Sequence, residues 1–132
     1  MVGVVIVSHS SEIARGVKNL VEQISPDSNV ASAGGTKDGR LGTDACKIKS
    51  AIEKVYSEDG VLILFDLGSA YMNAEMAIEF LDKSMQSKVQ IINGALVESA
   101  LIAVVDASIG KSIEEIKEHL KCMCIDKMPL PN

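Results

Sequence analysis

A histidine follows the first apolar run of the chain, at the point where a strand is predicted to end. Residues 2–7 read Val-Gly-Val-Val-Ile-Val, and an apolar run rich in β-branched residues is typical of a strand buried on both faces. His9 comes next but one, between the hydroxyl residues Ser8 and Ser10. Open α/β sheets bind their ligands at the carboxyl ends of the strands. His9 is therefore placed to act as a base, a metal ligand or a covalent nucleophile.

An aspartate stands at the same place on another predicted strand. Residues 61–65 read Val-Leu-Ile-Leu-Phe, and Asp66 follows at once. In a flavodoxin-like sheet the first and third strands are neighbours and the switch point lies between them, so we expect His9 and Asp66 to face one crevice. A carboxylate that accepts a hydrogen bond from one imidazole nitrogen fixes the tautomer and leaves the other nitrogen as the nucleophile. The alternatives are a polar rim histidine and an aspartate that only caps the following helix.

Groups suited to an anion are expected around this crevice. The turn that follows Asp66 leads into a predicted helix, whose first backbone N–H groups lack partners within the helix. A glycine-rich loop, residues 34–42, follows the second predicted strand on the same rim. Its spacing is not that of a P-loop, so the loop alone does not predict nucleotide binding. The candidate anion-binding residues are Gly35, Thr36, Thr43, Leu67, Gly68 and Ser69.

These residues must be positioned by an alternation of strands and helices. Apolar runs predict strands, and helical periodicity between turn signals predicts helices. The predicted strands cover residues 2–7, 29–33, 61–65 and 88–92. The predicted helices cover residues 10–24, 43 or 44 to 56, 69–81, 94–107 and 112–121. Short links between alternating elements give right-handed crossovers, so we predict an α/β fold with a four-stranded parallel sheet in the order 2-1-3-4 and helices on both faces.

Other residues able to do chemistry fit structural roles better. His119 lies among the charged residues of the last predicted helix and is expected on the solvated surface. Cys122 and Cys124 have no second ligand pair, so no metal site is predicted. The methionines of the helix predicted over residues 69–81 have the spacing of core or interface side chains rather than of a cofactor site. The side chains of this helix that we expect to point largely inward are Met72, Met76, Ile78 and Phe80.

Length and composition narrow the class of protein. Residues 1–132 form a single predicted domain with a hydrophobic core, and the tail from about residue 124 is expected to be loosely held. The net charge of −5 and the scarcity of aromatic residues argue against a nucleic-acid partner. No apolar stretch nears the ~20 residues that span a membrane, and residues 1–7 are predicted to be a strand rather than a signal peptide. Three cysteines make no disulfide framework, so a cytoplasmic protein is expected.

Three stretches of the sequence resemble a known family. They are residues 7–10, residues 33–43 and residues 65–77, of which the last, Phe-Asp-Leu-Gly-Ser-Ala-Tyr-Met-Asn-Ala-Glu-Met-Ala, is the most specific. They are similar to the DhaM family, the phosphotransferase subunits of the phosphoenolpyruvate-dependent dihydroxyacetone kinases. That family is itself similar to the EIIA domain of the mannose class of the sugar phosphotransferase system (PTS). The resemblance extends over nearly the whole chain.

The resemblance implies a phosphocarrier. His9 matches the family's phosphoacceptor, which takes a phosphoryl group from phospho-HPr and passes it to ADP bound in the subunit DhaL. The ATP so formed phosphorylates dihydroxyacetone held by a third subunit, DhaK. Asp66 would orient the His9 ring and offset its positive charge, and the anion-binding residues named above would contact the phosphoryl group. The resemblance further implies a homodimer with no cofactor of its own, since ADP, ATP and magnesium reside in DhaL.

One segment departs from the family pattern, and two other functions remain open. After the fourth strand the family has Ala-Pro-Leu-Val-Glu-Gly-Ala, whereas residues 94–100 read Gly-Ala-Leu-Val-Glu-Ser-Ala. The lost proline is expected to alter the start of the following helix and with it the crevice wall. The alternatives are an EIIA component of a mannose-class sugar transporter and a flavodoxin-like regulatory module that is never phosphorylated. The long match over residues 66–77 favours DhaM over the transporter component.

Overall fold

Four apolar runs form a parallel sheet at the centre of the molecule. The computed structural model describes residues 1–124 and residue 127. The strands are β1 (Gly3–Ser8), β2 (Val30–Gly34), β3 (Val61–Phe65) and β4 (Val89–Ile92). Their order is β2-β1-β3-β4 and every pairing is parallel, so the predicted fold class and strand order are confirmed. Because Val7 of β1 lies opposite Phe65 of β3, the residues that follow these two strands emerge side by side.

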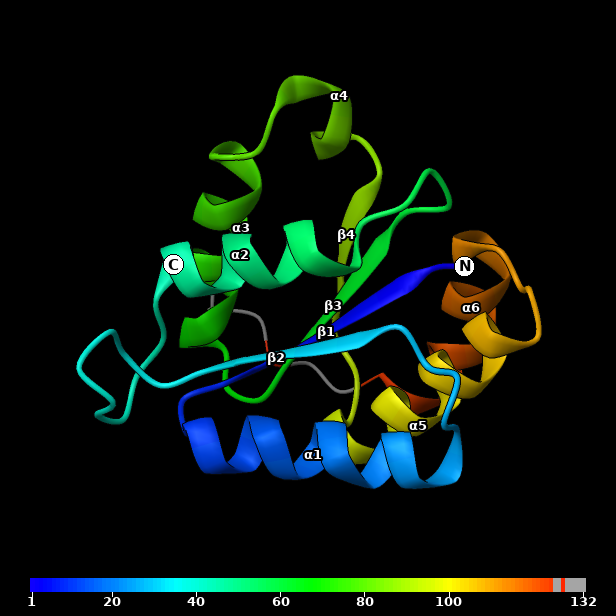
Figure 1. Ribbon diagram of the computed structural model, residues 1–132, viewed down its shortest axis with the longest axis horizontal. Coiled ribbons are helices and arrows are strands. Elements are labelled where there is room, and N and C mark those ends of the chain that lie inside the picture. Colours follow the sequence, from blue (N-terminus) through cyan, green and yellow to red (C-terminus); the bar gives the residue numbers. More distant parts are fainter. Residues whose placement is uncertain (125–126, 128–132) are drawn as a thin grey trace.

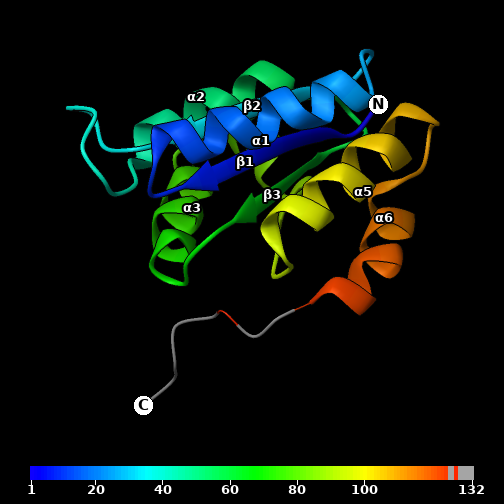
Figure 2. The same ribbon diagram turned by 90° about the horizontal axis from the view of Figure 1, so that it is seen from below.

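Helices cover both faces of the sheet (Figure 1). They are α1 (Ser11–Ile24), α2 (Ala45–Val55), α3 (Ser69–Glu79), α4 (Lys83–Gln86), α5 (Leu96–Ser108) and α6 (Ile113–Leu120), with a 3₁₀ turn at Lys121–Met123. Val4 and Ile6 of β1 pack in one core with α1, α5 and α6, whereas Val5 and Val7 pack in a second core with α2 and α3. Figure 2 shows α1, α5 and α6 on the near side of the sheet. Successive residues of β1 enter opposite cores because side chains alternate between the two faces of a strand.

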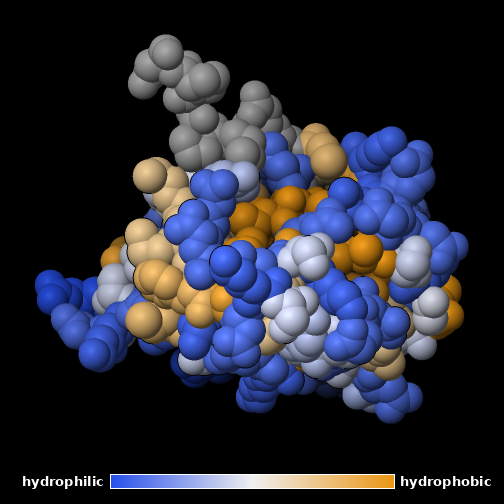
Figure 3. Space-filling view, turned by 90° about the horizontal axis from the view of Figure 1, so that it is seen from above, coloured by the Kyte–Doolittle hydropathy of each residue, from blue (hydrophilic) through white to orange (hydrophobic). Residues whose placement is uncertain are grey.

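The face of α3 that packs on the sheet is lined by alanine, and the prediction for its larger side chains is wrong. Ala70, Ala74 and Ala77 are fully buried. Met72, Met76 and Phe80 are instead 63%, 46% and 52% exposed, and only Ile78 is partly buried. Met72, Met76 and Phe80 follow one another at four-residue spacing and so share one side of the helix. Met72 and Met76 each come two residues after a buried alanine, which is about half a turn, so this side is opposite the buried one. Figure 3, which looks onto the face covered by α2, α3 and α4, shows hydrophobic side chains at the surface.

The segment that departs from the family pattern holds a close pair of residues. A Cβ atom added to Gly94 would lie 2.5 Å from the Oγ atom of Ser99, which is fully buried in the first turn of α5. The family pattern has alanine at the first of these positions and glycine at the second. The smaller residue at 94 therefore makes room for the larger one at 99. The α5 helix begins at Leu96, two residues later than predicted.

The remaining elements agree with their predicted bounds to within two residues, and α4 is an addition that the sequence did not predict. His119 is exposed, as predicted, and its Nδ1 atom lies 2.7 Å from Oδ2 of the buried Asp106. The predicted loose tail falls largely on residues 125–126 and 128–132, which lie outside the described residues. Within the described part, Cys124 forms an antiparallel bridge with Gly94. None of the described helices has the length and apolar character to cross a membrane.

Candidate functional site

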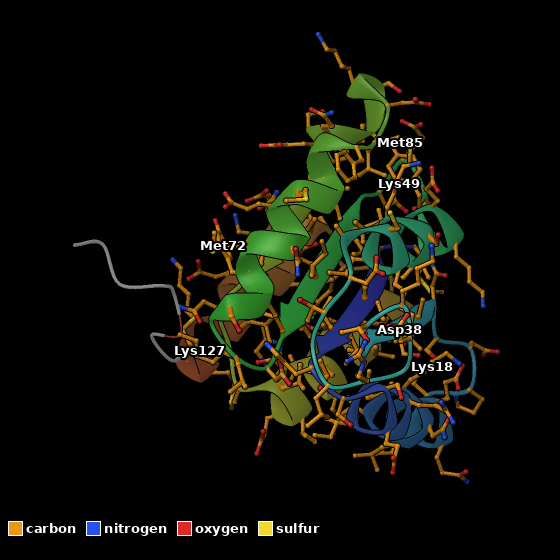
Figure 4. The ribbon with its side chains drawn as sticks, turned by 90° about the vertical axis from the view of Figure 1, so that its left-hand side faces the viewer. Lys18, Asp38, Lys49, Met72, Met85 and Lys127 are labelled. Atoms are coloured by element: carbon orange, nitrogen blue, oxygen red, sulfur yellow. The ribbon has the colours of Figure 1, made fainter. Side chains whose placement is uncertain are left out.

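His9 and Asp66 meet at the carboxyl edge of the sheet, onto which Figure 4 looks. Each residue comes directly after its strand, and β1 and β3 are neighbours. The Nδ1 atom of His9 lies 3.0 Å from Oδ1 of Asp66. The His9 side chain is 23% exposed and that of Asp66 is 18% exposed, so the pair is sheltered but open to an approaching molecule. The expected meeting of these two side chains at the strand ends is present in the structure.

Asp66 accepts hydrogen bonds that hold it in its ionised form. Burial opposes ionisation, but the bonds from His9, from the Ser8 hydroxyl and from the backbone outweigh burial and hold the pKa of the Asp66 carboxyl below its ordinary value. The Ser8 Oγ atom donates to Oδ2 over 2.7 Å, and the backbone N–H of His9 donates to the same oxygen over 3.0 Å. The N–H of Leu67 donates to Oδ1 over 2.7 Å. Asp66 is therefore a fixed anion beside the imidazole and does not cap α3.

The second ring nitrogen of His9 faces a hydroxyl group. Nε2 lies 2.7 Å from the Oγ atom of Ser69, the first residue of α3. An ionised Asp66 can only accept, so the proton of a neutral His9 ring is assigned to Nδ1. Nε2 then has a lone pair that accepts a hydrogen bond from Ser69. This lone pair is the nucleophile that the arrangement offers, and its contact with the Ser69 hydroxyl is exposed to solvent.

The glycine-rich loop braces the backbone beneath His9. The N–H of Gly42 donates to the His9 carbonyl over 2.7 Å, and the N–H of Gly35 donates to the Ser8 carbonyl over 3.2 Å. Gly35 has a φ of 76°, a left-handed conformation that favours glycine. The N–H of Thr36 donates to the Arg40 carbonyl over 2.9 Å. The N–H groups of Gly35, Thr36 and Gly42 therefore already donate to backbone carbonyls. A phosphoryl group could bind them only if these hydrogen bonds first broke.

Some of the other predicted anion-binding residues also have their hydrogen-bonding groups engaged within the fold, and others do not. The Thr43 hydroxyl accepts a hydrogen bond from the side-chain amide of Asn73, and the N–H of Leu67 is bound to Asp66. Gly68 and Ser69 open α3, where an α-helix has no internal acceptor for its first N–H groups. The N-cap residue is Gly68, which has no side chain to cap these N–H groups. Of the candidate residues, Gly68 and Ser69 therefore have backbone N–H groups with no acceptor within the helix, and Ser69 also has its hydroxyl at Nε2 of His9.

Lys127 is a site neighbour that sequence reasoning missed. Its Nζ atom donates to the backbone carbonyls of Phe65 and Gly94, and it lies 4.8 Å from the centre of the Phe65 ring. Burial lowers the pKa of Lys127, and the negative charge of Asp66 opposes that shift. Figure 4 places Lys127 across the strand ends from the loop that carries Asp38. No local pattern could identify it, because the contact joins a lysine near the end of the chain to a carbonyl 62 residues earlier.

Two other supporting residues had weak sequence signals. Ser8 ends β1 with a fully buried side chain, and its hydroxyl also accepts the N–H of Ser10 over 3.0 Å. A polar residue at the end of an apolar strand was the available sign. Asn73 on α3 ties that helix to Thr43. Across the described part of the chain, no three His, Cys, Asp or Glu side chains are grouped to hold a metal ion.

Comparison with known proteins places this chain in a family. The family model described as "PTS system fructose IIA component", EIIA-man, matches residues 3–117. The phosphotransferase subunit DhaM of a PTS-dependent dihydroxyacetone kinase from Lactococcus lactis is 40% identical over 126 residues, which cover 95% of this chain and 98% of that protein. The chain belongs to the DhaM family.

Other DhaM proteins are similar over most of this chain. A DhaM phosphoryl donor subunit from Listeria innocua is 39% identical over 121 residues, covering 91% of this chain and 97% of that subunit. The DhaM of Escherichia coli is 42% identical over 120 residues, which are 88% of this chain but 25% of the longer Escherichia coli protein. The DhaM fold therefore occurs both as a subunit of this length and as one part of a longer chain.

Solved structures share the DhaM fold. A crystal structure of a protein of unknown function has a TM-score of 0.81 at 31% identity, covering 92% of this chain and 94% of that one. A PTS component EIIA from Streptococcus agalactiae has a TM-score of 0.64 at 18% identity, covering 91% of this chain and 89% of that one. The second likeness concerns the fold alone.

Proposed function

We propose that this chain is the phosphocarrier subunit of a phosphoenolpyruvate-dependent dihydroxyacetone kinase. It accepts a phosphoryl group from phospho-HPr on His9 and transfers it to ADP bound in DhaL, which drives phosphorylation of dihydroxyacetone held by DhaK. The relatives from Lactococcus lactis and Listeria innocua are named as subunits of such kinases. The observation that carries the proposal is the 3.0 Å contact between Nδ1 of His9 and Oδ1 of Asp66 in a chain of this family.

The reaction at His9 is an in-line transfer between two imidazoles. Nε2 of His9 attacks the phosphorus atom, the new N–P bond forms, and the N–P bond of the phosphohistidine donor breaks with its electron pair returning to the donor ring. The His9 ring becomes positively charged as the bond forms, and ionised Asp66, 3.0 Å from Nδ1, offsets that charge. Phosphoryl transfer depends mainly on positioning and charge stabilisation, which a fixed ring and a fixed carboxylate supply.

The oxygens of the phosphoryl group bind at the start of α3. The Ser69 hydroxyl, 2.7 Å from Nε2 in the unphosphorylated chain, turns from the ring nitrogen to the phosphoryl oxygens. The N–H groups of Gly68 and Ser69 add donors at the positive end of the helix dipole. The remaining predicted contacts, from Gly35, Thr36, Thr43 and Leu67, require the internal bonds described above to open.

The chain needs no cofactor of its own in this reaction. ADP, ATP and magnesium stay with DhaL, and this subunit works as a homodimer in the cytoplasm. A shallow site supports this division of labour, since a phosphohistidine must be reached first by a donor protein and then by an acceptor protein. The His9 and Asp66 side chains keep 23% and 18% of their surfaces exposed.

A reconstitution with labelled phosphoenolpyruvate tests the proposal. Enzyme I, HPr and this chain are mixed with or without DhaL and DhaK, and both the label on each protein and the formation of dihydroxyacetone phosphate are followed. Label is expected on the wild type and on the His119→Ala variant, which lacks the other of the two histidines, but not on His9→Ala. With DhaL present, the label is expected to move to the nucleotide.

Two outcomes would replace the proposal. Label that remains on His9 in the presence of DhaL but moves to a sugar-specific EIIB protein would make the chain a component of a mannose-class transporter. A wild-type chain that takes no label from phospho-HPr would make it a regulatory module of flavodoxin-like fold. The position of any label is read by mass spectrometry of the peptide that contains His9.

A further inference from the structure

A groove of about 750 Å³ runs along the outer edge of the sheet. Its floor is β2, the edge strand, and its walls are α1 and α2, which lie on either side of β2 in Figure 1. Residues 31–34 of β2 line it together with residues from both helices. This groove is separate from the contacts that hold His9 and Asp66, and none of the roles proposed above uses it.

The groove is strongly basic in a chain that is acidic overall. Five cations line it, Arg15 and Lys18 from α1, Lys37 from the glycine-rich loop, and Lys47 and Lys54 from α2. The lining includes one carboxylate, Asp44, which caps α2 by accepting hydrogen bonds from the N–H groups of Cys46 and Lys47. The formal charge of the whole chain is −5, so positive charge has been collected on one side of the molecule.

Four of the five groove cations lack an acidic partner within the described part of the chain. Lys18 pairs with Glu22, but no carboxylate lies within 4.0 Å of Arg15, Lys37, Lys47 or Lys54. Elsewhere, only Lys83 and Lys127 share this condition among the lysines and arginines that the structure describes. Lys47 instead donates to the Gly34 carbonyl over 3.2 Å. The charge of the groove therefore stays available to a partner.

One end of the groove adjoins the phosphoacceptor. Gly34 and Ser11 line the groove, and Gly34 lies opposite Ser8, the residue before His9, in the strand register. The loop that carries Lys37 returns to the site, where the N–H of Gly42 donates to the His9 carbonyl. Figure 4 shows Lys18 and Asp38 on the side of the strand ends occupied by α1 and this loop. A partner seated in the groove therefore reaches the rim of the His9 crevice.

The chemistry of the groove fits an acidic protein surface better than a small ligand. No aromatic side chain lines it, so a nucleotide base or sugar finds no stacking partner. Four of its five cations are lysines, which act as mobile point charges rather than as a rigid fork for phosphate. Arg15, Lys37 and Lys54 are exposed. Exposed charge of one sign steers an oppositely charged partner and raises its association rate by ~10- to 10³-fold.

The geometry points to this groove, defined by its five cations, as the docking surface for an acidic face of the nucleotide-holding acceptor protein. The inference rests on the proposed function. It favours the acceptor over the phosphoryl donor because of charge. In the donor step one phosphoryl group is shared between two imidazoles, whereas in the acceptor step a phosphohistidine, which carries about −2, must approach a nucleoside diphosphate. A basic surface beside His9 lowers that repulsion.

Charge reversal in the groove tests the docking surface. The test variant combines Arg15→Glu with Lys54→Glu, and its control combines Lys83→Glu with Lys121→Glu, which changes the net charge by the same amount at exposed positions outside the groove. Stopped-flow measurements at low salt follow transfer of label from phospho-HPr to His9, and then from His9 to ADP held by DhaL. Association of DhaL·ADP with each chain is measured separately in a His9→Gln background, where no transfer occurs.

We expect the test variant to slow the acceptor step and the association with DhaL by at least ~10-fold, with the difference shrinking as added salt screens the charges. The control and the donor step should change less than about twofold, because the altered charges lie away from the surface that each step uses. An equal effect of the control, or a loss confined to the donor step, would overturn the inference.

DhaL that binds through these cations but receives no label would overturn the proposed function and leave the docking surface standing. Binding that ignores the reversal, or no binding, would overturn the docking surface.

Discussion

His9 is joined to both oxygens of a single carboxylate. Its ring nitrogen Nδ1 lies 3.0 Å from Oδ1 of Asp66, and its backbone N–H donates to Oδ2 over 3.0 Å. The ring and the main chain of His9 are thus positioned by the same group, which is itself fixed by Ser8 and by the N–H of Leu67. The arrangement leaves Nε2 of His9 as the reactive atom and predicts several measurable properties.

Phosphorylation is expected at Nε2 of His9 and not at Nδ1. Asp66 holds Nδ1, whereas Nε2 faces the crevice beside the Ser69 hydroxyl. Long-range ¹H–¹⁵N NMR spectra of the phosphorylated chain distinguish the two isomers. In Ser69→Ala we expect the same isomer, formed roughly 10-fold more slowly because one donor to the phosphoryl oxygens is lost. A signal from the Nδ1 isomer would contradict the assigned tautomer.

Loss of the charge on Asp66 is expected to slow transfer without unfolding the chain. Asp66→Asn keeps the shape of the side chain but cannot offset the positive charge that develops on the ring, so we expect a fall of roughly 10²-fold in the rate of His9 phosphorylation. Rapid-quench measurements with phospho-HPr give the rate, and circular dichroism checks the fold. The control, Asp27→Asn, removes an exposed carboxylate from the turn before β2. Equal rates for the wild type and Asp66→Asn would remove Asp66 from the mechanism.

Asp66 is expected to make stability depend on pH in the acid range. Its pKa is lowered in the folded chain from an ordinary value of about 3.9, so its contribution is present above about pH 4 and is lost as the pH falls through the folded value. The free energy of unfolding, from urea titrations, is compared for the wild type and Asp66→Asn. The difference between them should shrink below about pH 4. A difference that grows with acidity would mean that the carboxyl pKa is raised.

Gly94 and Ser99 are expected to be coupled. Gly94→Ala places a Cβ atom 2.5 Å from the Ser99 Oγ atom and should lower the free energy of unfolding by about 1–3 kcal/mol. Ser99→Gly should relieve most of that cost, giving a coupling energy of about 1–2 kcal/mol in a double-mutant cycle. Ser99→Ala should stabilise the chain by about 1 kcal/mol, since the buried hydroxyl has no hydrogen-bond partner among the described residues. Additive effects of Gly94→Ala and Ser99→Gly would contradict the steric link.

The exposed side chains of α3 are expected to contribute little to the stability of the monomer. Replacing Met72 and Met76 by glutamine should change the free energy of unfolding by less than about 0.5 kcal/mol each, because both residues are exposed. Ala74→Ser is the contrasting variant, since it introduces a hydroxyl on the buried face of the same helix. Sedimentation equilibrium of the glutamine variants shows at the same time whether the proposed homodimer uses this face. A large loss of monomer stability would mean that the face is covered within the chain.

The sequence predicted those features of the fold for which a pattern of residues is compatible with few structures. Four apolar strands separated by helices leave few topologies, so the strand order and the meeting of His9 with Asp66 could be predicted. The buried face of α3 could not be predicted, because this helix is apolar on more than one side. Only the close packing of α3 on the sheet determines that its alanines are the buried residues. Lys127 was missed because its partners are backbone carbonyls distant in sequence, which have no signature in side-chain types.

The site also depends on when its parts are synthesised. His9 and Asp66 are 57 residues apart in the chain, so a ribosome working at ~5–20 residues per second makes Asp66 roughly 3–11 s after His9. Until β3 has been made and joins the sheet, the imidazole has neither its orienting carboxylate nor the hydroxyl of Ser69. A nascent chain without β3 therefore has no oriented imidazole at His9. Under the proposed function, phosphorylation of His9 therefore reports that β3 and the start of α3 have joined β1, and chains that have not reached this stage take no phosphoryl group from the donor.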